Sequence, residues 1–204
     1  MQKTKAIIFD LGGVILNIDY NLTRKAFENA GIKNFHDMYS QASADELFSS
    51  LETGKISNDN FYKEFNKRTG LNLPVEQIEH AWNAMLLTFR EDSLTFLDSI
   101  RSQYNLYLLS NTNHIHLAAF NKIYHATERS KTFNKYFDKA YYSCEMGLRK
   151  PNSNIYEFVL KENNLTPGNT IFVDDSVQNV EAARLVGMQA ILLEPGKFIE
   201  DLNL

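Results

Sequence analysis

The sequence of 204 residues has little cysteine, no long hydrophobic run and no excess of positive charge. Its single cysteine, Cys144, excludes an intrachain disulfide and suits a reducing compartment such as the cytoplasm. No apolar run approaches the ~20 residues that a membrane-spanning helix needs, and the first residues carry no apolar signal segment. The net charge of -4 gives no electrostatic reason to expect a nucleic acid partner. We therefore expect a cytoplasmic protein that binds neither membrane nor nucleic acid.

What the sequence does contain is an ordinary globular composition, with 44% hydrophobic and 23% charged residues. Short apolar segments typical of buried strands alternate with segments of helical periodicity. These predicted strands are residues 5–9, 106–110, 140–143, 170–173 and 189–193. Such alternation predicts parallel β-α-β units. The expected fold class is α/β, with a Rossmann-like parallel sheet covered by helices on both faces.

A helical segment separates the first predicted strand from the others. Residues 17–90 contain four stretches with apolar residues at helical spacing, the last from Val75 to Leu87, and glycine or proline punctuates them. We predict a four-helix cap over 17–90 and an α/β core over 1–16 and 91–204. The aromatic residues of the cap are expected mainly to form its own core. Because the insert follows Asp10 closely, it can cover the strand ends like a lid.

Chemically useful side chains follow four of the predicted strands. They are Asp10 after the first, Ser110 and Asn111 after the second, Lys150 past the third, and Asp174 and Asp175 after the fourth. Taken singly, each motif has an ordinary structural explanation, such as a turn or a helix N-cap. Together they share one edge of a parallel sheet, where ligands bind in open α/β folds. This shared location favours a functional site.

The residue types at this edge indicate phosphate chemistry. Three carboxylates in one crevice repel one another, and Mg²⁺ relieves the repulsion while binding carboxylates, water and phosphate oxygens. Lys150 can donate to phosphate oxygens or to the attacking carboxylate, and the hydroxyl of Ser110 can hold another phosphate oxygen. An aspartate can then attack phosphorus and form an aspartyl-phosphate that water cleaves. The sequence therefore predicts a Mg²⁺-dependent phosphatase.

In order and spacing, these motifs resemble those of the haloacid dehalogenase-like hydrolase superfamily. The resemblance is to subfamily I, the branch with a helical C1 cap after the first motif, and covers essentially the whole chain. Within that branch, the glucose-1-phosphate phosphatase-like group is similar in three segments. The similar segments are Phe-Asp-Leu-Gly-Gly-Val at 9–14, Ser-Asn-Thr-Asn at 110–113 and Gly-Leu-Arg-Lys-Pro at 147–151.

The resemblance implies a role for each motif residue. Asp10 would be the nucleophile and a Mg²⁺ ligand, and the backbone carbonyl of Gly12 would be a second ligand. Asp175 would ligate the metal directly, with Asp174 ligating it or holding its waters. The substrate would be a small phosphorylated metabolite, with sugar phosphates among the candidates. Its phosphate would be bound by Ser110, Asn111 and Lys150, the last also a catalytic residue.

Gly12 is a departure from the pattern of the superfamily. Most of its phosphatases carry a second aspartate two residues after the nucleophile, as general acid and base. With Gly12 the carbonyl ligand survives but the proton donor is lost, and such help is worth ~10²–10⁴-fold. We expect a slower phosphatase or a substrate with a good leaving group, such as a sugar 1-phosphate. Asp19 and Asp45 are near in sequence only, and neither is assigned this role.

Other functions fit part of the pattern. A metal-independent 2-haloacid dehalogenase would use Asp10 to attack carbon, but Asp174 and Asp175 would then remain as unneutralised charges. A signalling receiver module also combines aspartates, a hydroxyl and a lysine around Mg²⁺, but its acidic pair comes on the first strand and its lysine last. A catalytically impaired phosphate-binding protein is the remaining alternative, because Gly12 replaces an acid.

The histidines and the cysteine receive no catalytic role. His114 and His116 have a spacing that would suit metal ligation in a strand, but here they are predicted to begin a helix and face apart. Cys144, beside apolar neighbours, is expected to be a small packing residue. The other histidines stand alone in polar surroundings, at His36, His80 and His125.

Overall fold

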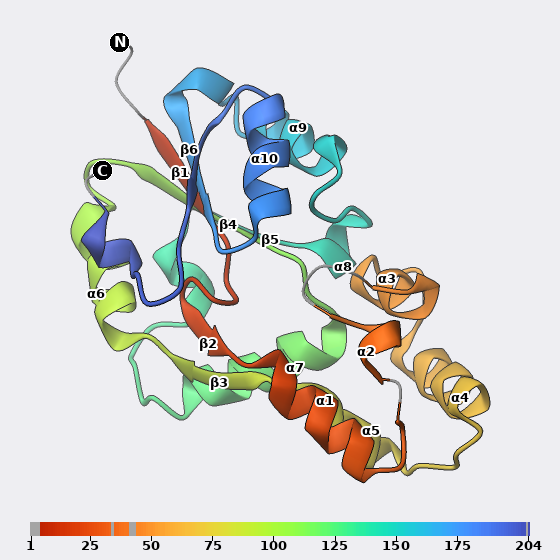
Figure 1. The fold of residues 1–204 in the computed structure, drawn as a ribbon. Coiled ribbons are helices and arrows are strands. Elements are labelled where there is room, and N and C mark those ends of the chain that lie inside the picture. Colours follow the sequence, from red (N-terminus) through yellow and green to blue (C-terminus); the bar gives the residue numbers. More distant parts are fainter. Residues whose placement is uncertain (1–4, 34, 41–43, 203) are drawn as a thin grey trace.

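A parallel sheet of five strands, in the order β5-β4-β1-β6-β7, forms the centre of the computed structural model (Figure 1). The structure describes residues 5–33, 35–40, 44–202 and 204, so the parts of the predicted core and cap at 1–4, 34, 41–43 and 203 lie outside the described residues. The strands are β1 Ala6–Phe9, β4 Asn105–Ser110, β5 Lys139–Tyr142, β6 Thr170–Asp174 and β7 Gln189–Leu192. All pair in parallel, which confirms the predicted α/β fold.

Strand β1 is buried on both faces because it lies in the middle of the sheet. Its alternate residues belong to different hydrophobic clusters, Ile7 and Phe9 to one and Ala6 and Ile8 to the other. Helices α6 (Glu91–Ile100) and α7 (His114–His125) contribute to the first cluster. Helices α9 (Ser153–Glu162) and α10 (Val177–Leu185) contribute to the second. The sheet is therefore covered on both faces.

A helical insert follows β1 and packs around a hydrophobic cluster of its own. Figure 1 shows these helices gathered beyond one end of the sheet. They are α1 Tyr20–Asn29, α2 Phe35–Met38, α3 Glu46–Glu52, α4 Asn58–Thr69 and α5 Val75–Asn83. The cluster includes Phe27, Phe48, Phe61 and Trp82, so the expected aromatic core is confirmed. We propose that these helices form the cap predicted from the sequence.

Two features of the insert differ from the prediction. The helix expected over Val75–Leu87 ends at Asn83, because the chain then forms strand β3 (Leu86–Phe89), which pairs antiparallel with β2 (Leu16–Ile18). A strand partner distant in sequence thus overrides local helical periodicity. The short helix α2 was also not predicted, so the described part of the insert contains five helices rather than four. The β2-β3 ribbon leads the chain out of the core and back.

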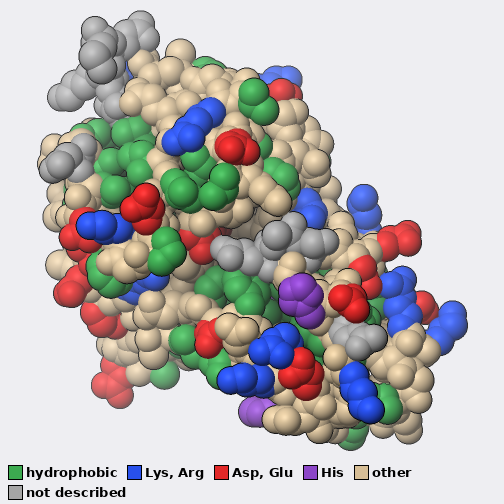
Figure 2. Space-filling model, viewed as in Figure 1, with side chains coloured by type: hydrophobic (Ala, Val, Ile, Leu, Met, Phe, Trp, Pro, Cys, Tyr) green, Lys and Arg blue, Asp and Glu red, His purple; other side chains and the backbone are tan. Residues whose placement is uncertain are grey.

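Shorter elements complete the fold: α8 Ser143–Met146 and the 3₁₀ turns Phe133–Tyr136, Pro167–Asn169 and Ile199–Asp201. Among the described residues, no helix has both the length and the apolar character needed to cross a membrane. On the face shown in Figure 2, acidic and basic side chains are interspersed rather than gathered in one basic surface. Cys144 lies buried in the core, as its predicted packing role requires.

Candidate functional site

The carboxyl ends of β1 and β6 bring three aspartates together. Phe9 is in register with Val173, and the backbone N–H of Asp10 donates to the carbonyl of Val173 at 2.9 Å. Asp10, Asp174 and Asp175 each offer one oxygen, and these oxygens lie within 4.8 Å of one another. The structure therefore brings Asp10 together with Asp174 and Asp175, which lie far from it in the chain, as the parallel-sheet argument predicts.

Lys150 lies between two of these carboxylates. Its Nζ is 2.7 Å from Asp10 Oδ1 and 2.6 Å from Asp174 Oδ2, and all three side chains are buried. The side chain of Asn111 holds the lysine loop in place, because its Nδ2 donates to the Lys150 carbonyl and its Oδ1 accepts from the Lys150 N–H, each at 2.9 Å. Both polar groups of the Asn111 side chain thus position Lys150, a role that the sequence did not indicate.

Negative charge dominates this cluster. The pKa of Asp10 is raised to about 7, above all by burial; Lys150 opposes the rise, whereas the nearby Asp174 and Asp175 contribute to it. Burial alone would lower the pKa of Lys150, but the carboxylates of Asp10 and Asp174 hold it above its ordinary value. Lys150 is therefore an ammonium that pairs with Asp10 and Asp174, and the charge of Asp175 also acts on the guanidinium of Arg90. A further cation among the three carboxyl groups would favour their ionisation together.

Asp174 and Asp175 differ in their surroundings. Asp174 is fully buried and accepts hydrogen bonds from the Ser176 N–H and from Asn179 Nδ2, in addition to Lys150. Asp175 is partly exposed and lines a cavity. It lies close to Gly13, whose φ is +73° and where a Cβ would be only 2.1 Å from Asp175 Oδ2. Glycine is required at position 13 for this approach.

The space beside Gly12 is already filled. A Cβ built at Gly12 would lie 2.9 Å from Cδ1 of Ile18, a residue of β2, so an apolar side chain occupies the region that a residue at position 12 would enter. The two nearby acids are engaged elsewhere as helix N-caps: Asp19 accepts from the Asn21 N–H, and Asp45 from the Leu47 N–H. Neither lines the cavity, so neither replaces the missing acid in this structure.

A cavity of about 90 Å³ opens above the carboxylates, between the core and the insert. Asp10, Gly12, Asn111, Lys150 and Asp175 line it from the core. Ser110 is buried at the end of β4 and does not line the cavity. The opposite wall includes residues that the sequence analysis missed, namely Tyr20, Tyr39, Glu52, His116 and Arg149.

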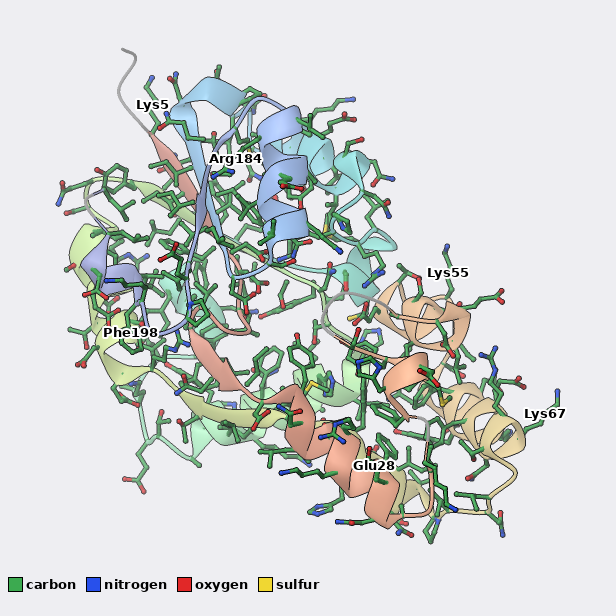
Figure 3. The ribbon with its side chains drawn as sticks, viewed as in Figure 1. Lys5, Glu28, Lys55, Lys67, Arg184 and Phe198 are labelled. Carbon is green, nitrogen blue, oxygen red and sulfur yellow. The ribbon has the colours of Figure 1, made fainter. Side chains whose placement is uncertain are left out.

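Glu52 is the acidic residue of that wall. It comes from the end of α3, its side chain is 4% exposed, and it accepts a hydrogen bond of 2.9 Å from the hydroxyl of Tyr39. Arg149 Nη2 lies 2.8 Å from Glu52 Oε2, which joins the insert to the loop that carries Lys150. Burial raises the pKa of Glu52, whereas Arg149 and Tyr39 lower it. Lysines of the insert such as Lys55 and Lys67 point outward from the molecule (Figure 3) and supply no charge here.

His116 contributes a neutral ring to the same wall. The predicted helix does begin at His114, as α7. The ring of His116 stacks on Trp82 at 4.5 Å between centroids, and its Nδ1 is 2.9 Å from Asn83 Oδ1. Burial lowers the pKa of His116 to about 3, so the ring is uncharged at neutral pH. The spacing of His114 and His116 in the sequence does not indicate this role, because the role depends on the packing of α7 against α5.

The chain is similar to known hydrolases over most of its length. The family model described as haloacid dehalogenase-like hydrolase matches residues 4–187. D-ribitol-5-phosphate phosphatase of Bacteroides thetaiotaomicron is 32% identical over 192 residues, which cover 94% of this chain and 93% of that protein.

Two solved structures are also similar. A haloacid dehalogenase (HAD) family enzyme of B. thetaiotaomicron, in complex with magnesium and inorganic phosphate, has a TM-score of 0.88 and 30% identity, covering 98% of this chain and 100% of that one. A HAD-like family hydrolase of Porphyromonas gingivalis has a TM-score of 0.86 and 31% identity, covering 96% of this chain and 93% of that one.

Proposed function

Because the chain belongs to the haloacid dehalogenase-like hydrolase family, we propose that it is a Mg²⁺-dependent phosphatase acting on a small phosphomonoester. The observation that carries this proposal is the meeting of Asp10, Asp174 and Asp175 within 4.8 Å, beside Lys150. It favours phosphate chemistry over a metal-independent dehalogenase, which would leave this negative charge uncompensated. The similarity to a sugar-alcohol phosphate phosphatase, and to an enzyme solved with magnesium and phosphate, supports the same conclusion.

The donor atoms at the site fit magnesium. They are carboxylate and carbonyl oxygens, which a small hard cation prefers, and oxygens of the three carboxylates lie within 4.8 Å of one another. We propose that Asp10, Asp175 and the carbonyl of Gly12 hold the ion, with Asp174 ligating it or its waters. When bound, the ion neutralises charge on the carboxylates and on the substrate phosphate.

The residues of the chain then have distinct tasks. The carboxylate of Asp10 attacks phosphorus, forming an aspartyl-phosphate as the ester P–O bond breaks and its electron pair leaves with the leaving-group oxygen. Water protonates that oxygen, because no acid is present at position 12. Lys150 keeps the Asp10 carboxylate oriented and donates to phosphate oxygens together with the Asn111 backbone N–H. A second water attacks phosphorus, breaks the bond to Asp10 and releases phosphate.

We propose that the substrate is a small phosphorylated metabolite, a sugar phosphate or a sugar-alcohol phosphate. The similarity to D-ribitol-5-phosphate phosphatase supports this class. We also propose that the protein acts in the cytoplasm, since its only cysteine is a buried free thiol.

Phosphate release from a panel of sugar phosphates, nucleotides and phosphorylated acids tests the function. We expect release that requires Mg²⁺, stops with EDTA and is lost in Asp10→Asn. Asp59→Asn, which removes an exposed carboxylate from the first turn of α4, is the matched control and should keep wild-type turnover. Halide release without metal would support the dehalogenase alternative. Phosphate binding without any turnover would support an impaired binding protein.

A further inference from the structure

Two buried acceptors belong to residues that line the cavity. Nε2 of His116 has no hydrogen-bond donor in the described part of the chain, and Oε2 of Glu52 has Arg149 Nη2 at 2.8 Å. Buried polar atoms are nearly always hydrogen-bonded, and one left without a partner costs free energy. The unpartnered Nε2 of His116 therefore indicates a ligand that brings a donor, and Glu52 in the lining of the same cavity can accept from a second donor.

Glu52 is built to receive a further donor. Tyr39 donates to Oε1, and Arg149 Nη2 lies 2.8 Å from Oε2. A carboxylate has about four acceptor positions, so lone pairs of Oε2 remain for a ligand. The ion pair with Arg149 balances the charge of Glu52, while Nε of Arg149 has no acceptor among the described residues.

His116 adds an acceptor of fixed orientation. Because Asn83 Oδ1 can only accept, Nδ1 of His116 carries the proton and Nε2 carries the lone pair. Stacking on Trp82 fixes the plane of the ring. The neutral state that burial imposes keeps Nε2 an acceptor at physiological pH. A neutral donor such as a hydroxyl suits this atom.

We propose, building on the proposed phosphatase function, that Glu52 and His116 form a subsite for the hydroxyl groups of a sugar or sugar-alcohol chain that carries the phosphate. Hydroxyls donate to Glu52 Oε2 and His116 Nε2, while the side chains of Met85 and Leu86 line the cavity beside the carbon chain. A leaving group with a carboxylate or second phosphate would bring its charge towards Glu52. The subsite therefore selects a neutral polyhydroxylated leaving group and disfavours a phosphorylated acid.

Substrate discrimination tests the subsite. The measurement is kcat/KM for D-ribitol 5-phosphate, for pentyl phosphate, which lacks the hydroxyls, and for 3-phosphoglycerate, which is an acid. We expect the wild type to prefer the first. Glu52→Gln should lower the ratio of ribitol to pentyl phosphate about tenfold, since hydrogen bonds to a charged acceptor are the stronger ones. It should also raise the relative rate with 3-phosphoglycerate. Glu46→Gln, an exposed carboxylate on the same helix, is the matched control and should change neither ratio.

A second variant keeps the test independent of the Glu52–Arg149 pair. His116→Phe retains a ring beside Trp82 but removes Nε2, and it should lower the ribitol-to-pentyl ratio about fivefold. The proposal is overturned if either variant lowers kcat/KM for both substrates by one factor, or if the wild type does not prefer the polyol phosphate. Failure of the phosphatase function looks different, because no substrate would then release phosphate in an Asp10-dependent way.

Discussion

Replacing Lys150 by methionine removes one ammonium from between two buried carboxylates and keeps a similar side-chain length. In the structure, Nζ lies 2.7 Å from Asp10 Oδ1 and 2.6 Å from Asp174 Oδ2. Removing one partner of a buried ion pair costs ~3–5 kcal/mol, since the other charge is left uncompensated. For a chain of this size, that loss corresponds to a melting temperature lower by about 6–20 °C. Lys150 should therefore stabilise the folded protein even when no substrate is bound.

Thermal unfolding, measured once in EDTA and once in excess Mg²⁺, tests this prediction. In EDTA, Lys150→Met should unfold well below the wild type, while Lys139→Met, which breaks the exposed pair with Glu162, should stay close to it. Added Mg²⁺ should stabilise Lys150→Met more than the wild type, because the ion then replaces the positive charge lost from between Asp10 and Asp174. Equal melting temperatures of the two variants, or equal shifts with Mg²⁺, would refute the reasoning.

Three further predictions concern the metal, the leaving group and the cap. Gly13→Ala places a Cβ 2.1 Å from Asp175 Oδ2, so titration calorimetry should show Mg²⁺ affinity at least ~10-fold weaker, whereas Gly168→Ala, in open space, should not change it. Without an acid at position 12, log kcat should fall more steeply with leaving-group pKa than in relatives that carry the second aspartate; a flat dependence with chemistry rate-limiting would point to another proton donor. Phe48→Ala leaves a cavity in the aromatic cluster of the insert. It should lower the free energy of unfolding, measured in urea, by ~3–5 kcal/mol, far more than Phe158→Ala at a half-exposed site.

The sequence alone was sufficient to predict the parallel sheet and the aspartates at its edge. Strand-length apolar runs ended at Asp10 and at Asp174, and parallel pairing necessarily brings such ends to one side of the sheet. Lys150 follows the strand that pairs with β4, so the same rule places it nearby. These inferences need only strand periodicity and the direction of the strands.

The other wall of the site could not be predicted in the same way. Glu52 and His116 lie on helices, and their contribution depends on how α3 and α7 pack against partners distant in sequence. The end of α5 at Asn83 was missed for a similar reason, because β3 exists only through its pairing with β2. The positioning role of Asn111 rests on two hydrogen bonds to a loop 39 residues away. Such contacts leave no periodic pattern in a single sequence.

Acid quenching during turnover with Mg²⁺ and p-nitrophenyl phosphate, followed by peptide mapping with mass spectrometry, tests the central claim most directly. We predict a phosphoryl group on the peptide that contains Asp10, formed only with Mg²⁺ and lost when the substrate is exhausted. A phosphoryl group on a different residue, or a burst of p-nitrophenolate with an unmodified Asp10 peptide, would contradict the account.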